Sequence, residues 1–258
     1  IRWLPLTREL LQCPEVREIS HWIYLAPIWT LDEHLPLIEL TQPQKIVAMS
    51  STRIYTKKSE KDEAPASEIA ILKNLQRGEA RLKNWCEEKG IQWVLLRPTL
   101  VFGLGRDGNI AEIMRFISKF QWFPILGHGN GLRQPVHVND LAKTILAALN
   151  CETKMNRAFN VAGGEVLAYR EMVRRIFELL HLPPRIIQVP VIAFKAAFLL
   201  LNLHPRYRNW TVAMALRMNK DMVFDSTDAI AVLGHNPRKF VLTPTDLPQQ
   251  LDSKLGPR

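Results

Sequence analysis

Three short apolar runs, separated by longer polar segments, restrict the folds open to this chain. The runs are WIYLA (residues 22–26), KIVAMS (45–50) and WVLLR (93–97). Compact apolar runs of this length are typical of strands that are covered on both faces of a parallel sheet. Residues 65–88 carry apolar side chains at spacings that put them roughly on one face of a helix, which Gly90 is expected to end. This alternation predicts an α/β fold with a doubly wound, mostly parallel sheet.

The alternation continues to about residue 180 and then gives way to prolines and apolar helical segments. Asn109 is expected to cap a helix, and Asn139 or Asp140 to cap the next one. We therefore predict one domain over residues 1–182 and a smaller lobe over residues 183–258, packed on the first.

The second apolar run ends in three hydroxyl side chains, Ser50, Ser51 and Thr52, and Tyr55 follows closely. Some nicotinamide-dependent enzymes place a hydroxyl beside a substrate carbonyl in this way. The alternative is structural, because the same hydroxyls can satisfy backbone groups at the end of a strand. Tyr55 is a further candidate for moving protons, although a free phenol with a pKa of about 10 is a weak proton carrier at pH 7.

Composition narrows the classes of partner. The formal net charge of +9 favours acidic partners such as phosphates, nucleotide sugars, anionic lipid surfaces or nucleic acid. No basic motif interleaved with aromatic residues supports nucleic acid, and the net charge does not choose among the other partners. The three widely spaced cysteines suit a reducing compartment, predicted to be the cytoplasm, and the seven histidines show no metal-ligand spacing.

An ordered series of motifs resembles the extended short-chain dehydrogenase/reductase family, the NAD-dependent epimerase/dehydratase group. The motifs are IYLAPIW (23–29), MSSTRIY (49–55), LLRPTLVFG (95–103), LRQPVHVNDLAKTI (132–145), FNVAGGE (159–165) and LGHNPRKF (233–240). The resemblance implies a Rossmann fold, NAD or NADP as cofactor, and hydride exchange at a sugar or alcohol carbon.

The resemblance also implies site residues. Ser51 falls at the catalytic serine of the family, and Thr52 beside it would help to polarise the substrate oxygen. The residues that would line the cofactor are Ala26, Pro27, Ser50 and Pro98.

Two further positions would face the substrate. Arg133 falls at an arginine that contacts the diphosphate in nucleotide-sugar members, a task that suits a guanidinium fork. Asn109 falls at the asparagine that opens the substrate-side helix. The alternatives are a surface salt bridge for Arg133 and a plain helix cap for Asn109.

The chain departs from the family pattern in two places. Members begin with a glycine-rich loop that holds the cofactor pyrophosphate, whereas the first glycine here is Gly78. The start at Ile1 therefore suits a truncated chain with incomplete N-terminal units and poor cofactor affinity. The tyrosine and lysine that move protons in the family align with Ile71 and Leu75, and neither can do so.

The last third of the chain holds an apolar run (189–203) followed by Arg206, Arg208 and Trp210. This segment is either a core helix or a helix in a membrane interface. The second alternative favours a lipid-linked substrate and a peripheral membrane contact. The long helix over residues 65–88 is also where a homodimer would form by resemblance.

Three hypotheses follow for the function. The leading one is an NAD(P)-dependent oxidoreductase of the epimerase/dehydratase type, acting on a sugar nucleotide, a lipid-linked sugar or a related alcohol. The second is a non-catalytic relative that uses the fold for binding or assembly, since folds do not fix activities. The third is a fragment whose missing part completes the cofactor site.

Overall fold

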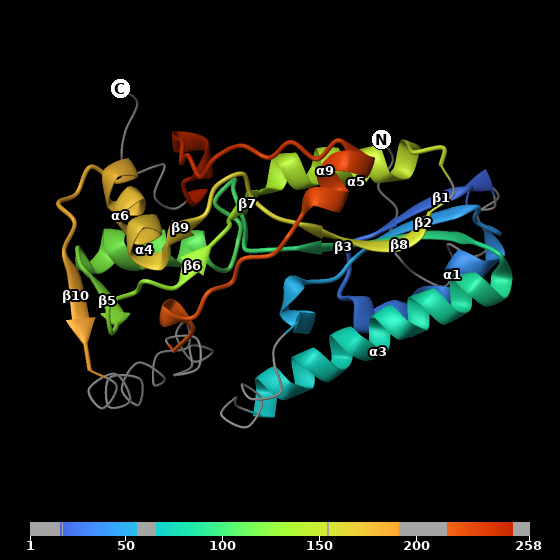
Figure 1. Cartoon of the computed structure of the whole chain (residues 1–258), viewed down its shortest axis with the longest axis horizontal. Helices are drawn as coiled ribbons and strands as arrows, with labels where there is room; N and C mark the ends of the chain where they lie inside the picture. The colour runs from blue at the N-terminus through green and yellow to red at the C-terminus, as the bar shows by residue number, and fades with distance from the viewer. Residues whose placement is uncertain (1–15, 17, 56–65, 154, 191–215, 250–258) are drawn as a thin grey trace. The chain divides into compact units, whose positions relative to one another are not determined.

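The computed structural model describes residues 16, 18–55, 66–153, 155–190 and 216–249 (Figure 1). The chain divides into two compact units, each assembled from stretches that are far apart in the sequence. The first unit draws on residues 1–98, 142–161 and 226–235, and the second draws on residues 99–141, 162–225 and 236–258.

The first unit contains a parallel sheet whose described strands lie in the order β1-β2-β3-β8. These strands are β1 (His21–Tyr24), β2 (Lys45–Met49), β3 (Gln92–Pro98) and β8 (Asn156–Val161). In the register, Ile46 lies opposite Trp93, and Leu95 opposite Ala158. The predicted α/β fold with a Rossmann-like parallel sheet is confirmed, as are the three predicted strands.

Helices cover this sheet. The helix α1 (Leu31–Leu40) and the long helix α3 (Ala66–Lys89) bury apolar residues in one cluster with alternate residues of β2 and β3. The short helix α9 (Thr227–Leu233) packs on β8 and lies on the opposite side of the sheet from α3 (Figure 1). Because both faces are covered, the strands read as continuous apolar runs in the sequence.

The helix α3 is anchored by its apolar face, where Leu82 and Cys86 are completely buried. Burial raises the pKa of the Cys86 thiol to about 12, so this cysteine is an unreactive core residue. Gly78 lets the helix pass close to the turn η3 (Ile28–Thr30). A Cβ atom at this position would lie 2.7 Å from the carbonyl carbon and oxygen of Ile28. Gly90, at φ +69°, ends the helix as predicted.

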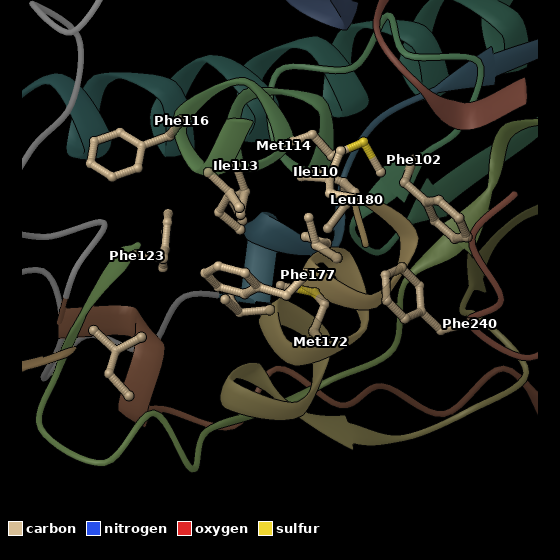
Figure 2. Close-up of a cluster of buried hydrophobic side chains, with 14 of the residues drawn as sticks. Phe102, Ile110, Ile113, Met114, Phe116, Phe123, Met172, Phe177, Leu180 and Phe240 are labelled. Carbon is tan, nitrogen blue, oxygen red and sulfur yellow. The ribbon is translucent and has the colours of Figure 1, made fainter. Parts of the chain in front are cut away.

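The second unit is built around α4 (Ile110–Phe120) and α6 (Tyr169–Leu179). Short strand pairs accompany them: β4 (Val101–Phe102) with β7 (Val136–His137), β5 (Phe123–Leu126) with β10 (Ile186–Val189), and β6 (Leu132–Arg133) with β9 (Leu167–Ala168). Aromatic and aliphatic side chains from both helices and from the segment around residue 240 fill the core, which Figure 2 shows.

The start of α5 (Val138–Asn150) differs from the prediction. Asn139 and Asp140 lie inside the helix, so the predicted cap at either residue is wrong. The imidazole Nδ1 of His137 instead accepts the backbone N–H of Asn139 at 3.1 Å, and Nε2 then donates to Asp246 at 3.1 Å. The helix therefore begins after a histidine, a residue type that sequence rules seldom identify as a cap.

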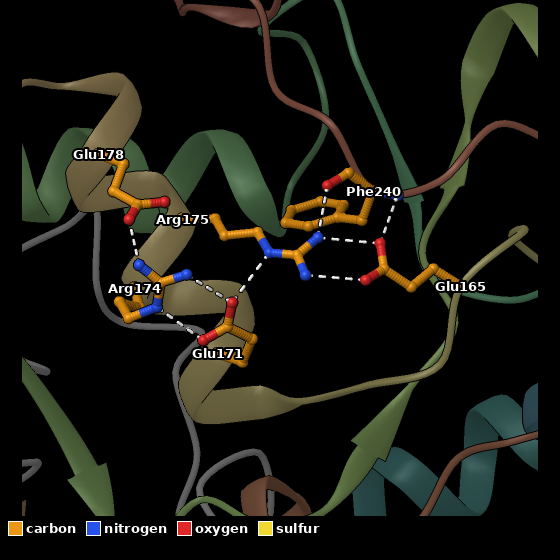
Figure 3. A network of polar contacts seen from close by, with 6 residues as sticks. All are labelled: Glu165, Glu171, Arg174, Arg175, Glu178 and Phe240. Carbon is orange, nitrogen blue, oxygen red and sulfur yellow. Dashed lines mark hydrogen bonds and ion pairs between the residues drawn. The ribbon is translucent and has the colours of Figure 1, made fainter.

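An ion-pair network on α6 links distant parts of the second unit (Figure 3). The guanidinium of Arg175 binds both carboxylate oxygens of Glu165, at 2.7 and 2.8 Å, and donates to the carbonyl of Phe240 at 2.9 Å. Arg174 and Arg175 both bind Glu171. The network thus ties α6 to the segments around residues 165 and 240.

Part of the sequence prediction lies outside the described residues. Most of the apolar run 189–203 and the basic residues after it belong to this part of the chain. Among the helices that the structure does describe, none is both long and apolar enough to cross a membrane.

Candidate functional site

The predicted hydroxyl cluster follows the carboxyl end of β2. The backbone N–H of Ser50 donates to the carbonyl of Leu96 at 2.8 Å, which extends the β2–β3 pairing by one residue. The turn η4 (Thr52–Tyr55) then begins beside the end of β3. In open parallel sheets, ligands bind at the carboxyl edge of the strands, so these hydroxyls lie where a site is expected.

The three hydroxyls have different partners. Ser50 donates to the Glu79 carboxylate at 2.5 Å, and Thr52, which is 3% exposed, donates to the carbonyl of Pro98 at 3.2 Å. Ser51 is partly exposed, and its oxygen accepts the N–H of Arg53 at 3.2 Å. Within the described part of the chain, the Ser51 proton has no acceptor. Ser51 is therefore the hydroxyl that is placed to donate to a ligand.

A buried carboxylate joins three elements at this edge. Glu79, from α3, accepts from Ser50 and from the Nε of Arg97 at 3.0 Å, and it also binds Nη2 of Arg97. Its side chain is 9% exposed and that of Arg97 is 19% exposed. The hydrogen bond from Arg97 to Glu79 raises the pKa of the guanidinium and so favours its charged form.

The remaining donor of Arg97 points to Tyr55. Nη1 donates to the phenol oxygen at 2.7 Å, and the guanidinium carbon lies 5.3 Å from the centre of the phenol ring. The phenol donates to Oδ1 of Asn160, at the end of β8, at 3.0 Å. A chain of polar contacts thus runs from Ser50 through Glu79, Arg97 and Tyr55 to Asn160.

The sequence prediction gave no site role to Glu79, Arg97 or Asn160. Two signals were present in the sequence. Arg97 stands at the end of an otherwise apolar strand, and Glu79 stands between apolar positions of the long helix. A buried charge requires a partner of opposite sign, so these two residues could have been paired before the structure was known.

The proposed cofactor-lining residues Ala26, Pro27 and Pro98 lie at the carboxyl ends of β1 and β3. Ala26 packs against the apolar cluster, and Pro27 is exposed, with its carbonyl accepting both the N–H and the hydroxyl of Thr30 at 2.8 Å. Pro98 is buried at the end of β3. Ala26, Pro27 and Pro98 therefore remain a predicted lining of the cofactor, made of small and apolar side chains. The 258 residues contain no glycine-rich loop, so no residue is assigned to the phosphates.

The positions of the family's tyrosine and lysine are apolar in structure as well as in sequence. Leu75 is 4% exposed in the cluster between α3 and the sheet, and Ile71 packs against the same cluster. The helix therefore presents no proton carrier at either position. The described residues also contain no group of three or more His, Cys, Asp or Glu side chains that could hold a metal ion.

The two predicted substrate residues belong to the second unit. Arg133 is 6% exposed, and its Nη1 donates to the carbonyls of Leu132 and Lys220 at 2.8 and 2.7 Å. Its Nη2 donates to the carbonyl of Arg217. Burial lowers the pKa of this guanidinium to about 10. The alternative of a surface salt bridge is wrong, because the side chain is buried and binds carbonyls.

Asn109 is exposed and occupies the cap position of α4, as predicted, but its side chain makes no capping bond. The carboxylate of Asp107 does so instead, accepting the N–H groups of Asn109 and Ala111 at 2.9 and 3.1 Å. The amide of Asn109 is thus not used for the cap.

A parallel sheet with strand order β1-β2-β3-β8, covered by helices on both faces, defines a Rossmann-like α/β class of protein. Comparison with known proteins makes the assignment narrower. The model of the NAD dependent epimerase/dehydratase family matches residues 34–162, half of the chain. The chain belongs to this family.

Two relatives with different named roles, an epimerase and a subunit of a larger complex, each match part of the chain. The chain is 28% identical over 138 residues to a UDP-glucose 4-epimerase of Vibrio cholerae, covering 54% of this chain and 42% of the relative. It is 27% identical over 103 residues to the mitochondrial NADH dehydrogenase (ubiquinone) 1 alpha subcomplex subunit 9 of Arabidopsis thaliana, covering 40% and 25%. The chain thus spans less than half the length of these relatives.

Solved structures agree in fold. The chain matches an epimerase of Methanothermobacter thermautotrophicus with a TM-score of 0.66 at 16% identity, covering 96% of this chain and 75% of that chain. It matches the UDP-glucose 4-epimerase of Thermotoga maritima, solved with UDP-glucose, with a TM-score of 0.62 at 17% identity, covering 95% and 84%.

Proposed function

We propose that the chain is an NAD(P)-dependent oxidoreductase of the epimerase/dehydratase type that acts on a sugar nucleotide, a lipid-linked sugar or a related alcohol. The single observation that carries the proposal is the position of Ser51 at the carboxyl edge of the sheet, partly exposed and with its proton available. Membership of the family and the fold of its solved relatives support it.

In this proposal each residue at the edge has a defined task. Ala26, Pro27 and Pro98 line the cofactor, whose nicotinamide accepts or returns a hydride when it is bound. Ser51 donates a hydrogen bond to the substrate oxygen and so polarises the C–O bond. The hydroxyl of Thr52 donates to the carbonyl of Pro98 and so holds the turn η4 against the end of β3, where Pro98 lies. Ser50 holds Glu79 in the same way.

The substrate class is argued from charge. A sugar nucleotide carries a diphosphate, which a chain of net charge +9 attracts. Arg133 and Asn109 are the proposed contacts on the second unit. The cysteine usage supports a cytoplasmic location, with a peripheral membrane contact if the substrate is lipid-linked. A homodimer through α3 is also proposed by resemblance.

The test begins with calorimetric titration of the chain with NAD and with NADP, followed by an assay of UDP-glucose turnover. We expect saturable binding of one cofactor and measurable turnover. Ser51→Ala is expected to lower kcat by about 10²-fold, because it removes a donor to the developing charge on the substrate oxygen. Unchanged cofactor affinity in this variant separates lost catalysis from lost binding, and unchanged kcat would refute the role of Ser51.

Binding without turnover is the second candidate function. It is favoured by Ile71 and Leu75, which put apolar side chains where the family has its proton carriers. One relative is, by its name, a subunit of a larger complex. Absence of heat at millimolar NAD and NADP, together with absence of turnover, would favour this candidate over the first.

A further inference from the structure

The carboxylate of Asp246 joins several segments of the second unit, and the proposed function gives it no task. We propose that Asp246 is a positioning residue, which holds the turn of residues 103–105 and so fixes the segment that carries Asn109 to the substrate. The role in substrate binding rests on the proposed function. The hold on the turn is argued from the structure alone.

The turn has an unfavourable backbone conformation. Three consecutive residues have positive φ angles, Gly103 at +125°, Leu104 at +56° and Gly105 at +63°. Glycine adopts such angles readily, whereas the Cβ atom of a leucine then crowds the following carbonyl oxygen. The Leu104 side chain is 44% exposed, so its packing does not hold the backbone in place. Such a conformation persists only where surrounding contacts enforce it.

Asp246 makes one of these contacts. Its side chain is 3% exposed, and Oδ1 accepts the backbone N–H of Leu104 at 3.2 Å and the Nε2 of His137 at 3.1 Å. Oδ2 accepts the N–H and the hydroxyl of Thr243, each at 2.9 Å, and this caps the turn η7 (Pro244–Asp246). One buried carboxylate thus joins η7 to the turn of residues 103–105, which lies about 140 residues earlier.

The two glycines let the turn come close to its neighbours. A Cβ atom at Gly103 would lie 2.7 Å from the Nε2 of His137. A Cβ atom at Gly105 would overlap the carbonyl oxygen of Leu247, next to Asp246 in sequence. From α4, the Nη2 of Arg115 donates to the carbonyl of Gly105 at 3.1 Å. The turn is therefore held by α4 as well as by the segment around Asp246.

The turn leads directly into the proposed substrate contact. Three residues separate Gly105 from Asn109, which is exposed and occupies the cap position of α4 without making a capping bond. Asp107 accepts the backbone N–H of Asn109 at 2.9 Å. The segment is thus fixed by Asp107 at the helix and by Asp246 at the turn. A side chain on a segment that is already fixed loses less conformational entropy when it binds a ligand.

The first experiment needs neither cofactor nor substrate. Hydrogen exchange, read by mass spectrometry, is compared for peptides that span residues 103–109. We expect Asp246→Ala to speed their exchange by about tenfold, because the Leu104 amide loses a charged acceptor. Glu171→Ala is the control, since it breaks ion pairs with Arg174 and Arg175 in the same unit. Equal exchange rates in the two variants would overturn the inference.

A second variant keeps Asp246 and so does not depend on the folding of Asp246→Ala. Asparagine tolerates positive φ angles better than leucine does, and Leu104 is partly exposed. We expect Leu104→Asn to slow exchange in the same peptides by about three- to tenfold, because it relieves the strain that opposes the closed turn. Unchanged or faster exchange would show that the turn is not held against strain, contrary to the inference.

The third experiment tests the role in substrate binding through the KM and kcat for UDP-glucose. Asp246→Ala is expected to raise KM by about three- to tenfold and to change kcat by less than about twofold, since one binding contact is misplaced. In an Asn109→Ala background the same change should raise KM no further, because the contact that Asp246 positions is already gone. An equal rise in both backgrounds would overturn the positioning role.

The two levels of the inference fail separately. Absence of turnover by the unmodified chain would refute the proposed function, and with it the role of Asp246 in substrate binding. The exchange rates of residues 103–109 would still decide whether Asp246 holds the turn.

Discussion

The pair formed by Glu79 and Arg97 is the most buried ion pair at the candidate site, and it predicts a large local effect on stability. Glu79→Ala leaves the Arg97 guanidinium mostly buried without its carboxylate and removes the acceptor of Ser50. We expect the free energy of unfolding to fall by about 3 kcal/mol, measured by urea denaturation.

The exposed pair of Lys89 with Glu39 is a matched control, because Lys89 lies on the same helix. Both side chains are more than 40% exposed, so Glu39→Ala is expected to cost about 0.5 kcal/mol or less. Similar losses in the two variants would show that the buried pair contributes no more than a surface pair.

The same residues mark a limit of sequence-based prediction. The hydroxyls after β2 were predicted from the sequence, because they directly follow an apolar run. The sequence could not show which of these hydroxyls has a proton left to donate. Ser50 donates to Glu79, 29 residues away, and Thr52 donates to Pro98, 46 residues away. Hydrogen bonds between distant segments leave no local pattern.

At the scale of elements, the approach of α3 to the turn η3 depends on Gly78. Alanine has the higher helix propensity by about 1 kcal/mol, but its Cβ would clash with the Ile28 backbone. Overpacking of this kind costs about 1–3 kcal/mol, so we expect Gly78→Ala to destabilise the chain by about 1 kcal/mol net.

Ala80 is exposed on the same helix, so Ala80→Gly measures the effect of helix propensity on stability without any change in packing. Its expected cost is about 1 kcal/mol. If Gly78→Ala instead raises the urea midpoint, helix propensity decides the outcome and the close approach does not.

Element types were predicted from the sequence more reliably than their ends. The strands and helices of the first unit follow from apolar periodicity, which is a local property. The start of α5 was missed because the side chain that accepts its first N–H belongs to His137, which is itself held by Asp246 more than a hundred residues later.

At the scale of the whole molecule, the chain returns to its first unit after the second has begun. Residues 226–235 belong to the first unit, where Thr144 contacts His235 at 2.7 Å and Asp228 pairs with Arg157. No periodic pattern in the sequence marks such a return. The fold class could therefore be predicted, whereas the division of the chain into discontinuous units could not.

Stability in acid is the last prediction. Hydrogen bonds from Arg174 and Arg175 lower the pKa of Glu171 from 4.5 to about 2, and Arg175 also lowers the pKa of Glu165 (Figure 3). Because the folded pKa lies below the unfolded one, these carboxylates stabilise the fold above pH 4.5, and this contribution is lost as the pH falls towards 2. Glu171→Gln should therefore destabilise the chain at pH 6 and flatten its acid dependence below pH 4.5. Hydrogen exchange of α6 peptides at pH 6 and pH 3 measures this difference in acid dependence. The prediction is contradicted if the α6 peptides of Glu171→Gln lose as much protection between the two pH values as those of the unmodified chain.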